Sequence, residues 1–407
     1  MRRPGRLPIA IVTALVVAEA AVVIMRPRDR GPDPLPVQAR AYFSPAQLQR
    51  AETFRRGQTW LGLGQMAVGL AALALLVRYP PRRAMAIRRP VLAGAATAAT
   101  IAVVAGLAPL PLAAIARQRA KDVGLVTQSW LGYASDVAKS EAISAVFAGA
   151  GGAVLIVAMR RTGRRWWIPG TVAVVAFAVI TVYAGPIVLD PLFNKFTPLP
   201  AGALRSDVLE LARKANVDVG QVYVMDASRR TTAANAYVNG LGRTKRVVIF
   251  DTLLKDFTPA ETRGVVAHEL GHVHYRDVRN GLLWVAIVAP FGMWAAASLA
   301  ERLAPRDAPT GPRAIPAVAL SLALLLPAVT WISNQLSRDV ERRADAFSLE
   351  LTHEPRPFIG FQRRIAIQNV ADPDPPAVIQ FLFGTHPTTL QRIGQAEAFA
   401  KEETRGP

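Results

Sequence analysis

The chain has 407 residues, of which 51% are hydrophobic, and a positive mean hydropathy of +0.24, which is unusual for a soluble protein. The formal net charge of +19 could indicate a nucleic-acid partner, but the basic residues gather in short clusters between long apolar blocks. Such clusters are typical of loops that flank membrane spans, so we expect no nucleic-acid partner. The absence of cysteine excludes disulfides, thiolate metal sites and a cysteine nucleophile.

Seven apolar blocks of about 18 to 25 residues are each long enough to cross the roughly 30 Å of hydrocarbon in a bilayer. They cover residues 8–25, 60–77, 91–115, 142–159, 166–189, 281–300 and 314–332. The first block follows a basic start and resembles a signal peptide, but apolar residues continue without a break to Met25, which favours a retained span. Glu19 would then face a cavity or a partner rather than lipid. The sequence therefore predicts a multi-pass protein of the lipid bilayer.

Between residues 190 and 280 the chain becomes soluble in character. Residues 206–215 have the pattern of an amphipathic helix, and residues 222–225, 235–240 and 246–250 have the pattern of strands. The glycine-rich run 240–244 predicts a hairpin turn. A further helix begins after Thr258, where Pro259 and Glu261 complete the pattern of a capping box with proline at the first helical position.

That helix carries an H-E-x-x-H motif over residues 268–272. Because a helix has 3.6 residues per turn, His268 and His272 lie about 40° apart on one face, so both imidazoles can reach one metal ion. Glu269 lies beside them, where it can take a proton from a water that the metal activates. His274 falls about 240° round the helix from His268 and should point away. The motif predicts one Zn²⁺ per chain.

Two imidazoles and a water leave a tetrahedral zinc site one protein ligand short. A predicted helix over residues 334–351 offers Glu341 and Asp345, four residues apart, so that one can bind the metal while the other supports a ligand imidazole. An ordinary solvated face would explain these charges as well. Topology favours the site, because two spans separate His272 from Glu341 and both return to the same side of the membrane. If both helices continue unbroken, each ligand lies roughly 13 Å from the end of its span.

At these residues the sequence resembles the type I CAAX prenyl endopeptidases, a family of seven-span zinc proteases. The resemblance covers most of the chain. It rests on the motif at 268–272, on Glu341 and Asp345 with the preceding Asn334, Ser337 and Arg338, and on the segments 124–130, 191–199, 235–237, 386–387 and 392–393.

The resemblance implies a mainly α-helical integral membrane protein, with seven transmembrane helices around a chamber and a zincin-like catalytic domain of helices and a small β-sheet. Residues 1–189 would hold spans one to five, and residues 190–280 a catalytic insertion with the sheet and the metal helix. Residues 281–332 would form spans six and seven, and residues 333–407 a catalytic C-terminal region with the third zinc ligand.

The resemblance also implies roles for individual residues. Glu341 would be the third zinc ligand and Glu269 the general base, with Asp345 and Arg392 behind the ligands. His386 would assist zinc in stabilising the tetrahedral oxyanion. An edge strand would hold the substrate backbone by β-augmentation through Asn235, Ala236 and Tyr237.

We therefore expect a membrane-embedded zinc metalloendopeptidase whose substrate is a peptide or protein, lipidated if it follows the family's isoprenylated C-terminal peptides. Two alternatives stay open: a quality-control metalloprotease acting on non-lipidated membrane proteins, and a seven-span transporter or receptor in which the motif is incidental. The predominance of arginine over lysine favours a bacterial source, and thus its plasma membrane. The basic loops mildly place the catalytic face outside. The family implies a cytoplasmic catalytic face, which is our expectation.

Overall fold

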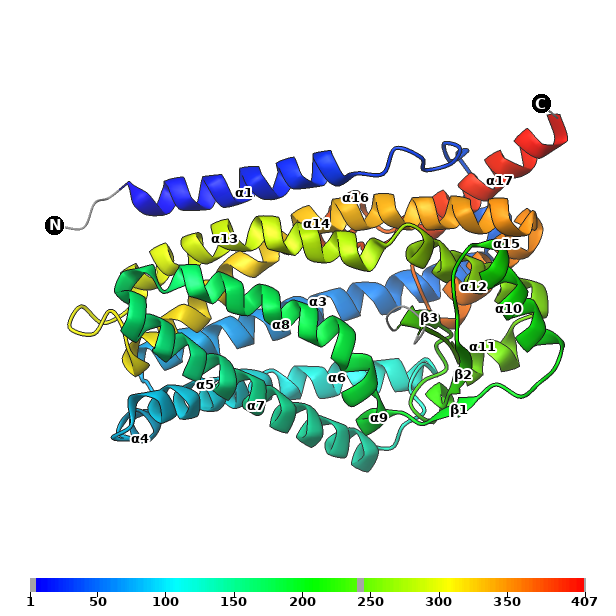
Figure 1. Cartoon of the computed structure of the whole chain (residues 1–407). Helices are drawn as coiled ribbons and strands as arrows, with labels where there is room; N and C mark the ends of the chain where they lie inside the picture. Colours follow the sequence, from blue (N-terminus) through cyan, green and yellow to red (C-terminus); the bar gives the residue numbers. More distant parts are fainter. Residues whose placement is uncertain (1–4, 240–244, 406–407) are drawn as a thin grey trace.

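The computed structural model describes residues 5–239 and 245–405, so the hairpin turn predicted at 240–244 lies outside the described residues. Within these ranges, seven helices are long and apolar enough to cross a membrane, and they run side by side in Figure 1. They are α1 (Arg6–Met25), α3 (Pro45–Arg78), α5 (Pro90–Leu107), α7 (Trp130–Thr162), α8 (Trp167–Val188), α13 (Asp277–Leu303) and α14 (Ile315–Thr352). The predicted membrane fold is confirmed.

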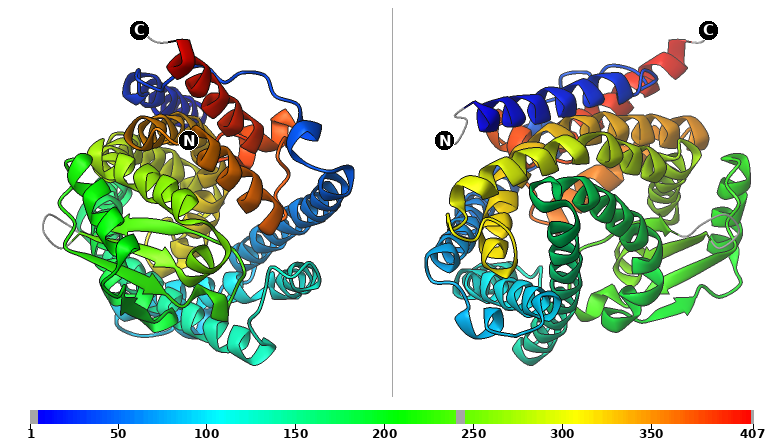
Figure 2. Two further views of the ribbon diagram at one scale, coloured as in Figure 1. Left: turned by 90° about the vertical axis from the view of Figure 1, so that its right-hand side faces the viewer. Right: turned by 60° about the vertical axis from the view of Figure 1, so that its left-hand side comes forward.

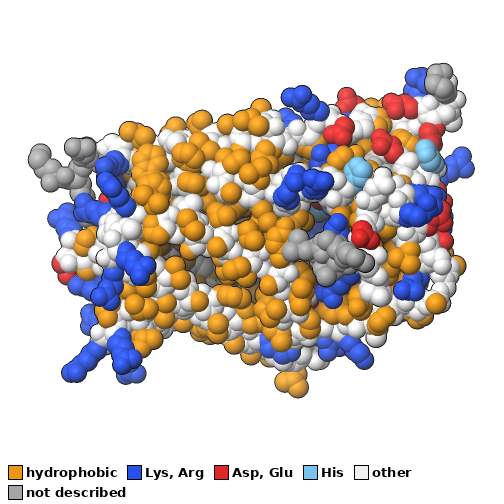
Figure 3. All heavy atoms as spheres, viewed as in Figure 1, with side chains coloured by type: hydrophobic (Ala, Val, Ile, Leu, Met, Phe, Trp, Pro, Cys, Tyr) orange, Lys and Arg blue, Asp and Glu red, His pale blue; other side chains and the backbone are white. Residues whose placement is uncertain are grey.

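The middle of the molecule presents hydrophobic side chains outward, while lysine and arginine gather at its two ends (Figure 3). Helix α8 is the clearest case, because Val172, Ile180 and Ile187 are all more than half exposed. Such exposure would be unfavourable in water and is favourable in lipid, where the backbone polar groups must be paired within each helix.

Helix α1 packs against α13 and α14 through a stripe of small residues. Ala10, Ala14 and Ala18 recur every four residues and are buried, which allows close approach of the helix backbones. Glu19 lies on this helix and accepts a hydrogen bond of 3.0 Å from the Nε2 of Gln335 on α14. The carboxyl group predicted to need a polar partner therefore has one.

The third predicted span is shorter than expected. We predicted one helix over residues 91–115, but α5 ends at Leu107 and a separate helix α6 (Leu110–Asp122) follows. Pro109 and Pro111 explain the break, because proline lacks the backbone N–H of a helix interior and is tolerated in a first turn. A run of apolar residues alone does not show where the helix is interrupted.

The connection from the motif helix to span six is also broken. Helix α12 (Pro259–His274) starts with the predicted capping box, in which the Thr258 N–H donates to Glu261 at 2.8 Å. The ligand-to-span distance estimated from the sequence assumed that α12 continues unbroken into the span, but Arg276 adopts a left-handed conformation with φ of 58°, and α13 starts at Asp277. By contrast, α14 runs unbroken from span seven through the predicted helix at 334–351.

A four-stranded sheet lies at one end of the bundle of spans, as the two views of Figure 2 show. Its order is β1-β2-β4-β3, with β2 and β4 parallel and the outer pairs antiparallel. The strands are β1 (Phe196–Pro198), β2 (Gln221–Met225), β3 (Ala236–Asn239) and β4 (Arg246–Phe250). We did not predict β1, which is too short to show an alternating pattern.

The sheet packs on helices that include α12. Val222, Val247 and Ile249 are fully buried against Val266 and Leu270 of α12 in one core. The other short helices of the chain, besides α6, are α2 (Ala39–Tyr42), α4 (Arg82–Met85), α9 (Asp190–Phe193), α10 (Ala203–Lys214), α11 (Asp251–Asp256), α15 (Pro355–Gln368), α16 (Ala377–Phe383) and α17 (Thr389–Arg405). This core fixes the helix that carries the H-E-x-x-H motif.

The segment that follows α1 crosses the outer side of α14. Asp339 of α14 pairs with both Arg26, at 2.7 Å, and Arg30, at 2.5 Å. Gly31 has a φ of +64°, and a Cβ atom there would lie 2.6 Å from the Cβ of Ala346. The chain therefore needs glycine at this close approach. The contacts hold α14 from the side away from α12.

Candidate metal centre

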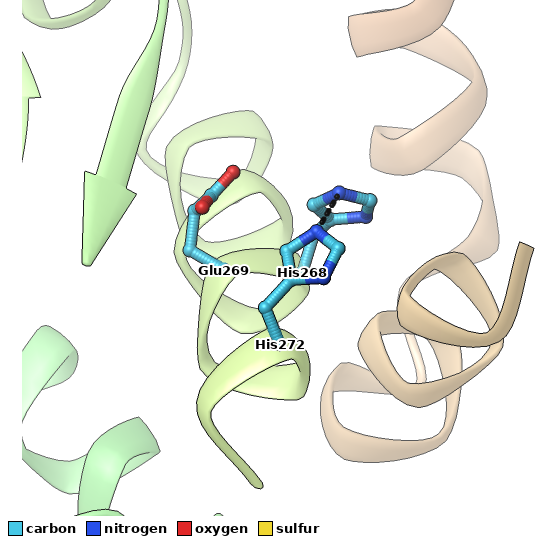
Figure 4. Close-up of side chains that lie close together, drawn as sticks. All are labelled: His268, Glu269 and His272. Carbon is cyan, nitrogen blue, oxygen red and sulfur yellow. Dashed lines mark hydrogen bonds between the residues drawn. The ribbon is translucent and has the colours of Figure 1, made fainter. Parts of the chain in front are cut away.

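The two imidazoles of the motif lie side by side on α12. Their Nε2 atoms are 3.2 Å apart, and their rings meet edge to face with centroids 4.8 Å apart. Figure 4 shows both rings on one side of the helix, as the spacing of four residues predicts. His268 is buried, at 7% exposure, within the packed interface with α14.

Glu341 reaches the same point from α14. Its Oε2 lies 3.1 Å from the Nε2 of His268, and its Oε1 lies 3.6 Å from the Nε2 of His272. Donor atoms around a tetrahedral zinc, with bonds of about 2.0–2.2 Å, lie roughly 3.3–3.6 Å from one another. The three side chains therefore have the mutual spacing that such an ion needs. The structure brings together the three residues predicted as ligands, and their role as ligands stays a prediction.

A glycine allows the two helices to approach this closely. A Cβ atom on Gly271 would lie 3.3 Å from the Cβ of Phe347 and 3.4 Å from the Cα of Ala344. A larger side chain at this position would need Phe347 or α14 to shift. Gly271 is the fourth residue of the H-E-x-x-H motif, so this position of the motif serves the packing of α12 against α14.

The charge of the donor set suits a divalent cation. Burial by itself would lower the pKa of His268, but the adjacent carboxylates of Asp345 and Glu341 outweigh burial and raise the pKa to about 10. The two carboxylates beside the buried imidazole of His268 bring negative charge to the site, which a divalent cation balances. The donor types, two imidazoles and a carboxylate, are those that zinc accepts.

Asp345 and Arg392 lie behind His268. The Oδ1 of Asp345 is 2.9 Å from the Nδ1 of His268, a close contact that is poorly aligned as a hydrogen bond. Arg392 donates to both carboxylate oxygens, at 2.8 and 2.5 Å, and the Asp345 side chain is fully buried. A bidentate pair of this kind fixes the carboxylate and hence the ring beside it.

Asp277 supports the other imidazole, and we did not predict it. Its Oδ2 lies 3.0 Å from the Nδ1 of His272, and its Oδ1 accepts a hydrogen bond of 2.5 Å from Arg343. The Arg343 guanidinium also lies 4.0 Å from the centre of the Tyr275 ring. The turn at Arg276 brings Asp277 back toward His272. The sequence offered one signal for this contact: Asp277 is an acidic residue at the start of the helix that follows the motif helix.

Glu269 leaves α12 on a different side from the imidazoles (Figure 4). One of its carboxylate oxygens nevertheless lies within 4.8 Å of a nitrogen of each ring. Burial raises the pKa of Glu269, against the opposing effect of the two imidazoles. A carboxylate with a raised pKa is a better proton acceptor, which is what a general base requires.

His386 lies on the loop between α16 and α17, on the far side of Glu341. Its Nε2 is 3.2 Å from the Oε2 of Glu341, and its Nδ1 is 2.9 Å from the hydroxyl of Thr385. Half of its side chain (53%) is exposed. The ring is thus open to a substrate while one nitrogen faces the metal ligands. Thr385 is a contact that the sequence did not indicate.

The predicted substrate strand is the terminal strand of the sheet and lies next to α12. Asn235 precedes β3 rather than belonging to it, and its side-chain oxygen accepts a hydrogen bond from the N–H of Ala236. The Tyr237 hydroxyl donates to Asp190 at 3.3 Å. Their role in binding substrate stays a prediction. His274 bonds the carbonyl of Ala215 at 2.9 Å, away from the metal ligands as expected.

Comparisons with known proteins agree with this geometry. Residues 198–400 match the model of peptidase family M48, and residues 29–195 match the CAAX prenyl protease N-terminal region, described as five membrane helices. The uncharacterized metalloprotease YhfN of Bacillus subtilis is 31% identical over 310 residues, which are 74% of this chain and 72% of that protein. The chain belongs to peptidase family M48. It is a membrane metalloprotease with a metal cofactor, similar to the CAAX prenyl proteases of that family.

Relatives named as CAAX prenyl proteases are similar over less of their length. The probable CAAX prenyl protease 1 of Schizosaccharomyces pombe is 31% identical over 230 residues, 54% of this chain and 48% of that one. The human CAAX prenyl protease 1 homolog is 41% identical over 85 residues, 21% of this chain and 18% of that one. The chain thus spans about half or less of these two proteins.

The fold matches that of a solved protein structure. The crystal structure of S. mikatae Ste24p superimposes with a TM-score of 0.78, covering 96% of this chain and 98% of that chain at 19% identity. The predicted architecture is therefore confirmed, as the sequence matches confirm the predicted family, and the protein is an integral multi-pass membrane protein that acts on peptides.

Proposed function

We propose that this M48 protein is a zinc metalloendopeptidase in which His268, His272 and Glu341 hold the ion. The observation that carries the proposal is the mutual spacing of their donor atoms, 3.2, 3.1 and 3.6 Å. Two of the three residues come from α12 and the third from α14, so the site forms only in the folded chain. Asp345 and Asp277 orient the two imidazoles by contacting their Nδ1 atoms.

Zinc bound at these residues would supply a Lewis acid that polarises the scissile carbonyl and lowers the pKa of a water molecule. Glu269 then accepts the proton of the attacking water, because it is the acidic side chain beside the ligands that no ion pair occupies among the described residues. The same carboxyl group returns the proton to the leaving amine nitrogen. Glu269 thus acts first as base and then as acid.

His386 donates a hydrogen bond to the oxyanion that develops on the substrate carbonyl. In the tautomer that this role requires, the Thr385 hydroxyl donates to Nδ1 and the ring proton lies on Nε2. The Nε2–H faces the ligand Glu341, where the carbonyl oxygen would arrive. The substrate backbone would extend along β3 at Asn235, Ala236 and Tyr237, adding a strand to the edge of the sheet.

The substrate we propose is a prenylated C-terminal peptide, as the names of the fungal and human relatives state for those proteins. We expect a farnesylated peptide to be cleaved with a KM at least ~10-fold below that of the same peptide without lipid, because the prenyl chain partitions into the bilayer beside the site. Mass spectrometry of the products from the two peptides, with the purified metal-loaded protein, measures the cleaved bond and both rates.

Equal rates on the two peptides would instead favour a quality-control protease that acts on non-lipidated membrane proteins. Absence of cleavage by a protein that holds one zinc ion per chain would contradict the endopeptidase assignment. Absence of any tightly bound metal would contradict the assignment of His268, His272 and Glu341 as zinc ligands.

We propose that the catalytic end faces the cytoplasm of a bacterium, across its plasma membrane. The absence of cysteine makes this testable without removing native thiols. We expect a membrane-impermeant maleimide to label an Arg83→Cys variant in intact cells, at the end opposite the sheet, and to leave a Lys401→Cys variant on α17 unlabelled until the cells are opened. The reverse pattern would place the catalytic end outside.

A further inference from the structure

Three side chains of α14 grip the backbone of the segment that carries His386. The Asn334 Nδ2 donates to the carbonyl of Leu382 at 2.9 Å, and the Ser337 hydroxyl donates to that of Thr385 at 2.8 Å. The Arg338 Nη1 donates to the carbonyls of Gly384, at 2.8 Å, and Gln380, at 3.2 Å. We call Asn334, Ser337 and Arg338 the α14 clamp.

The clamp meets α16 at its C-terminal end, which is Phe383. The last four carbonyls of a helix lack partners within it, and Leu382 supplies one of these, whereas the carbonyl of Gln380 also accepts from the Gly384 N–H at 2.9 Å. Arg338 also brings a positive charge to this C terminus, where the helix dipole favours it. No carboxylate contacts the Arg338 guanidinium in the part of the chain that the structure describes, so its polar contacts are made with this backbone.

The clamped segment has little freedom of its own. Gln380 donates to the carbonyl of His386 at 2.6 Å. A Cβ atom on Gly384 would lie 2.6 Å from the carbonyl oxygen of Gln380, so the chain turns too tightly there for a larger residue. A loop held by α14 on one side and by Gln380 on the other has one position relative to α14. His386 lies in this loop, two residues after Gly384.

The clamp lies one helical turn before Glu341 on the same helix. Spacings of three and four residues place Asn334, Ser337, Arg338 and Glu341 on one face of α14. The His386 Nε2 is 3.2 Å from the Oε2 of Glu341. The helix that supplies the third ligand therefore also sets where the His386 ring lies relative to that ligand.

We propose that Asn334, Ser337 and Arg338 are positioning residues for the hydrolysis. They touch no reacting atom and act through the loop, by fixing the distance between His386 and Glu341. This inference rests on the proposed function in one respect, the role of His386 toward the oxyanion. The clamp affects a group that acts in the transition state, so its loss lowers kcat and leaves KM and metal content unchanged.

The test compares two serines of α14. Ser337→Ala removes one clamp bond, whereas Ser333→Ala removes a hydroxyl that donates at 2.9 Å to Thr330 within its own helix. In full-length protein without metal, we expect amide hydrogen exchange over residues 384–388 to rise about fivefold in Ser337→Ala, the effect of one ordinary hydrogen bond. Ser333→Ala should exchange as the wild type does.

Kinetics on the metal-loaded protein distinguish an effect on the position of His386 from a general loss of fold stability. Ser337→Ala should lower kcat about fivefold at unchanged KM and zinc content, and should have no further effect in a His386→Ala background. Unchanged exchange in Ser337→Ala would overturn the inference whatever the activity. An equal loss of kcat with and without His386 would show that the clamp only stabilises the fold, and would overturn it too.

Failure of the proposed function is a different result. A wild-type protein that binds zinc and cleaves no peptide would refute the hydrolysis and with it the catalytic part of this inference. The exchange measurement would still decide whether the clamp holds the loop, because it needs neither metal nor substrate.

Discussion

Replacing Glu269 by glutamine is expected to lower kcat by at least about 10³-fold and to leave the metal in place. Glutamine has nearly the shape of glutamate but cannot accept a proton from water at neutral pH. The residue is not among the donors at 3.1 to 3.6 Å from one another, so removing its charge leaves His268, His272 and Glu341 as they are. The loss should therefore be one of turnover alone.

Steady-state cleavage of a peptide and metal analysis of the same sample measure this separation. Glu210→Gln is the matched control, since Glu210 lies on α10, is half exposed and pairs at 3.0 Å with Lys214. That variant should keep the wild-type kcat. Wild-type turnover by Glu269→Gln would remove the base assignment, and loss of zinc from it would make Glu269 a ligand.

The metal helix could be predicted because its signal is local. The spacing of His268 and His272 determines which face each imidazole occupies, whatever the rest of the chain does. The capping box at Thr258 likewise depends only on a few neighbouring residues, and the structure shows both of its hydrogen bonds. Apolar blocks of sufficient length also identified all seven spans, since bilayer thickness sets the requirement.

The pairing of α12 with α14 could not be derived from such patterns. The spacing of Glu341 and Asp345 allowed either carboxylate to be the ligand, and only the family resemblance favoured Glu341. In the structure the two differ in what they contact. Glu341 faces the Nε2 atoms of both imidazoles, whereas Asp345 contacts a Nδ1 atom and is held by Arg392.

The errors in the sequence analysis lie where the chain changes direction. Proline at 109 and 111 divides a run that looks continuous by composition, and the left-handed Arg276 separates α12 from α13. The second turn also decides chemistry, because it returns Asp277 to the Nδ1 of His272. The contacts that a turn makes depend on its backbone dihedral angles, and the pattern of hydrophobic residues does not predict those angles.

The polar residues of helix α14 serve three different functions, although in the sequence they look like one continuous polar stripe. Its outer side binds Arg26 and Arg30 through Asp339, and its inner side carries Glu341 and Asp345. The clamp residues extend the inner side by one turn toward the membrane. Because one unbroken helix bears all of them, a displacement of α14 would change the ligand and the His386 loop together.

Replacing Glu341 by glutamine is expected to weaken metal binding by more than ~100-fold, because it removes a charged donor from the ion itself. Asp277→Asn, which removes no metal donor but disturbs the support of His272 and the pair with Arg343, should weaken it by about 10- to 100-fold. Glu350→Gln, the same change on an exposed position of α14, should have no effect. Competition with a chelator of known affinity, followed by metal analysis, ranks the three variants.

Thermal unfolding gives an independent reading of the same order. A ligand that binds only the folded state stabilises it by RT ln(1 + [L]/Kd), so zinc should raise the Tm of the wild type and of Glu350→Gln alike. The rise should be smaller for Asp277→Asn and smallest for Glu341→Gln at the same free zinc. If Glu341→Gln kept wild-type affinity while Asp345→Asn lost the metal, the two carboxylates would have exchanged roles. The contacts of Asp345 with Arg392 and the Nδ1 of His268 would then have to rearrange on binding, since neither leaves Asp345 facing the Nε2 atoms.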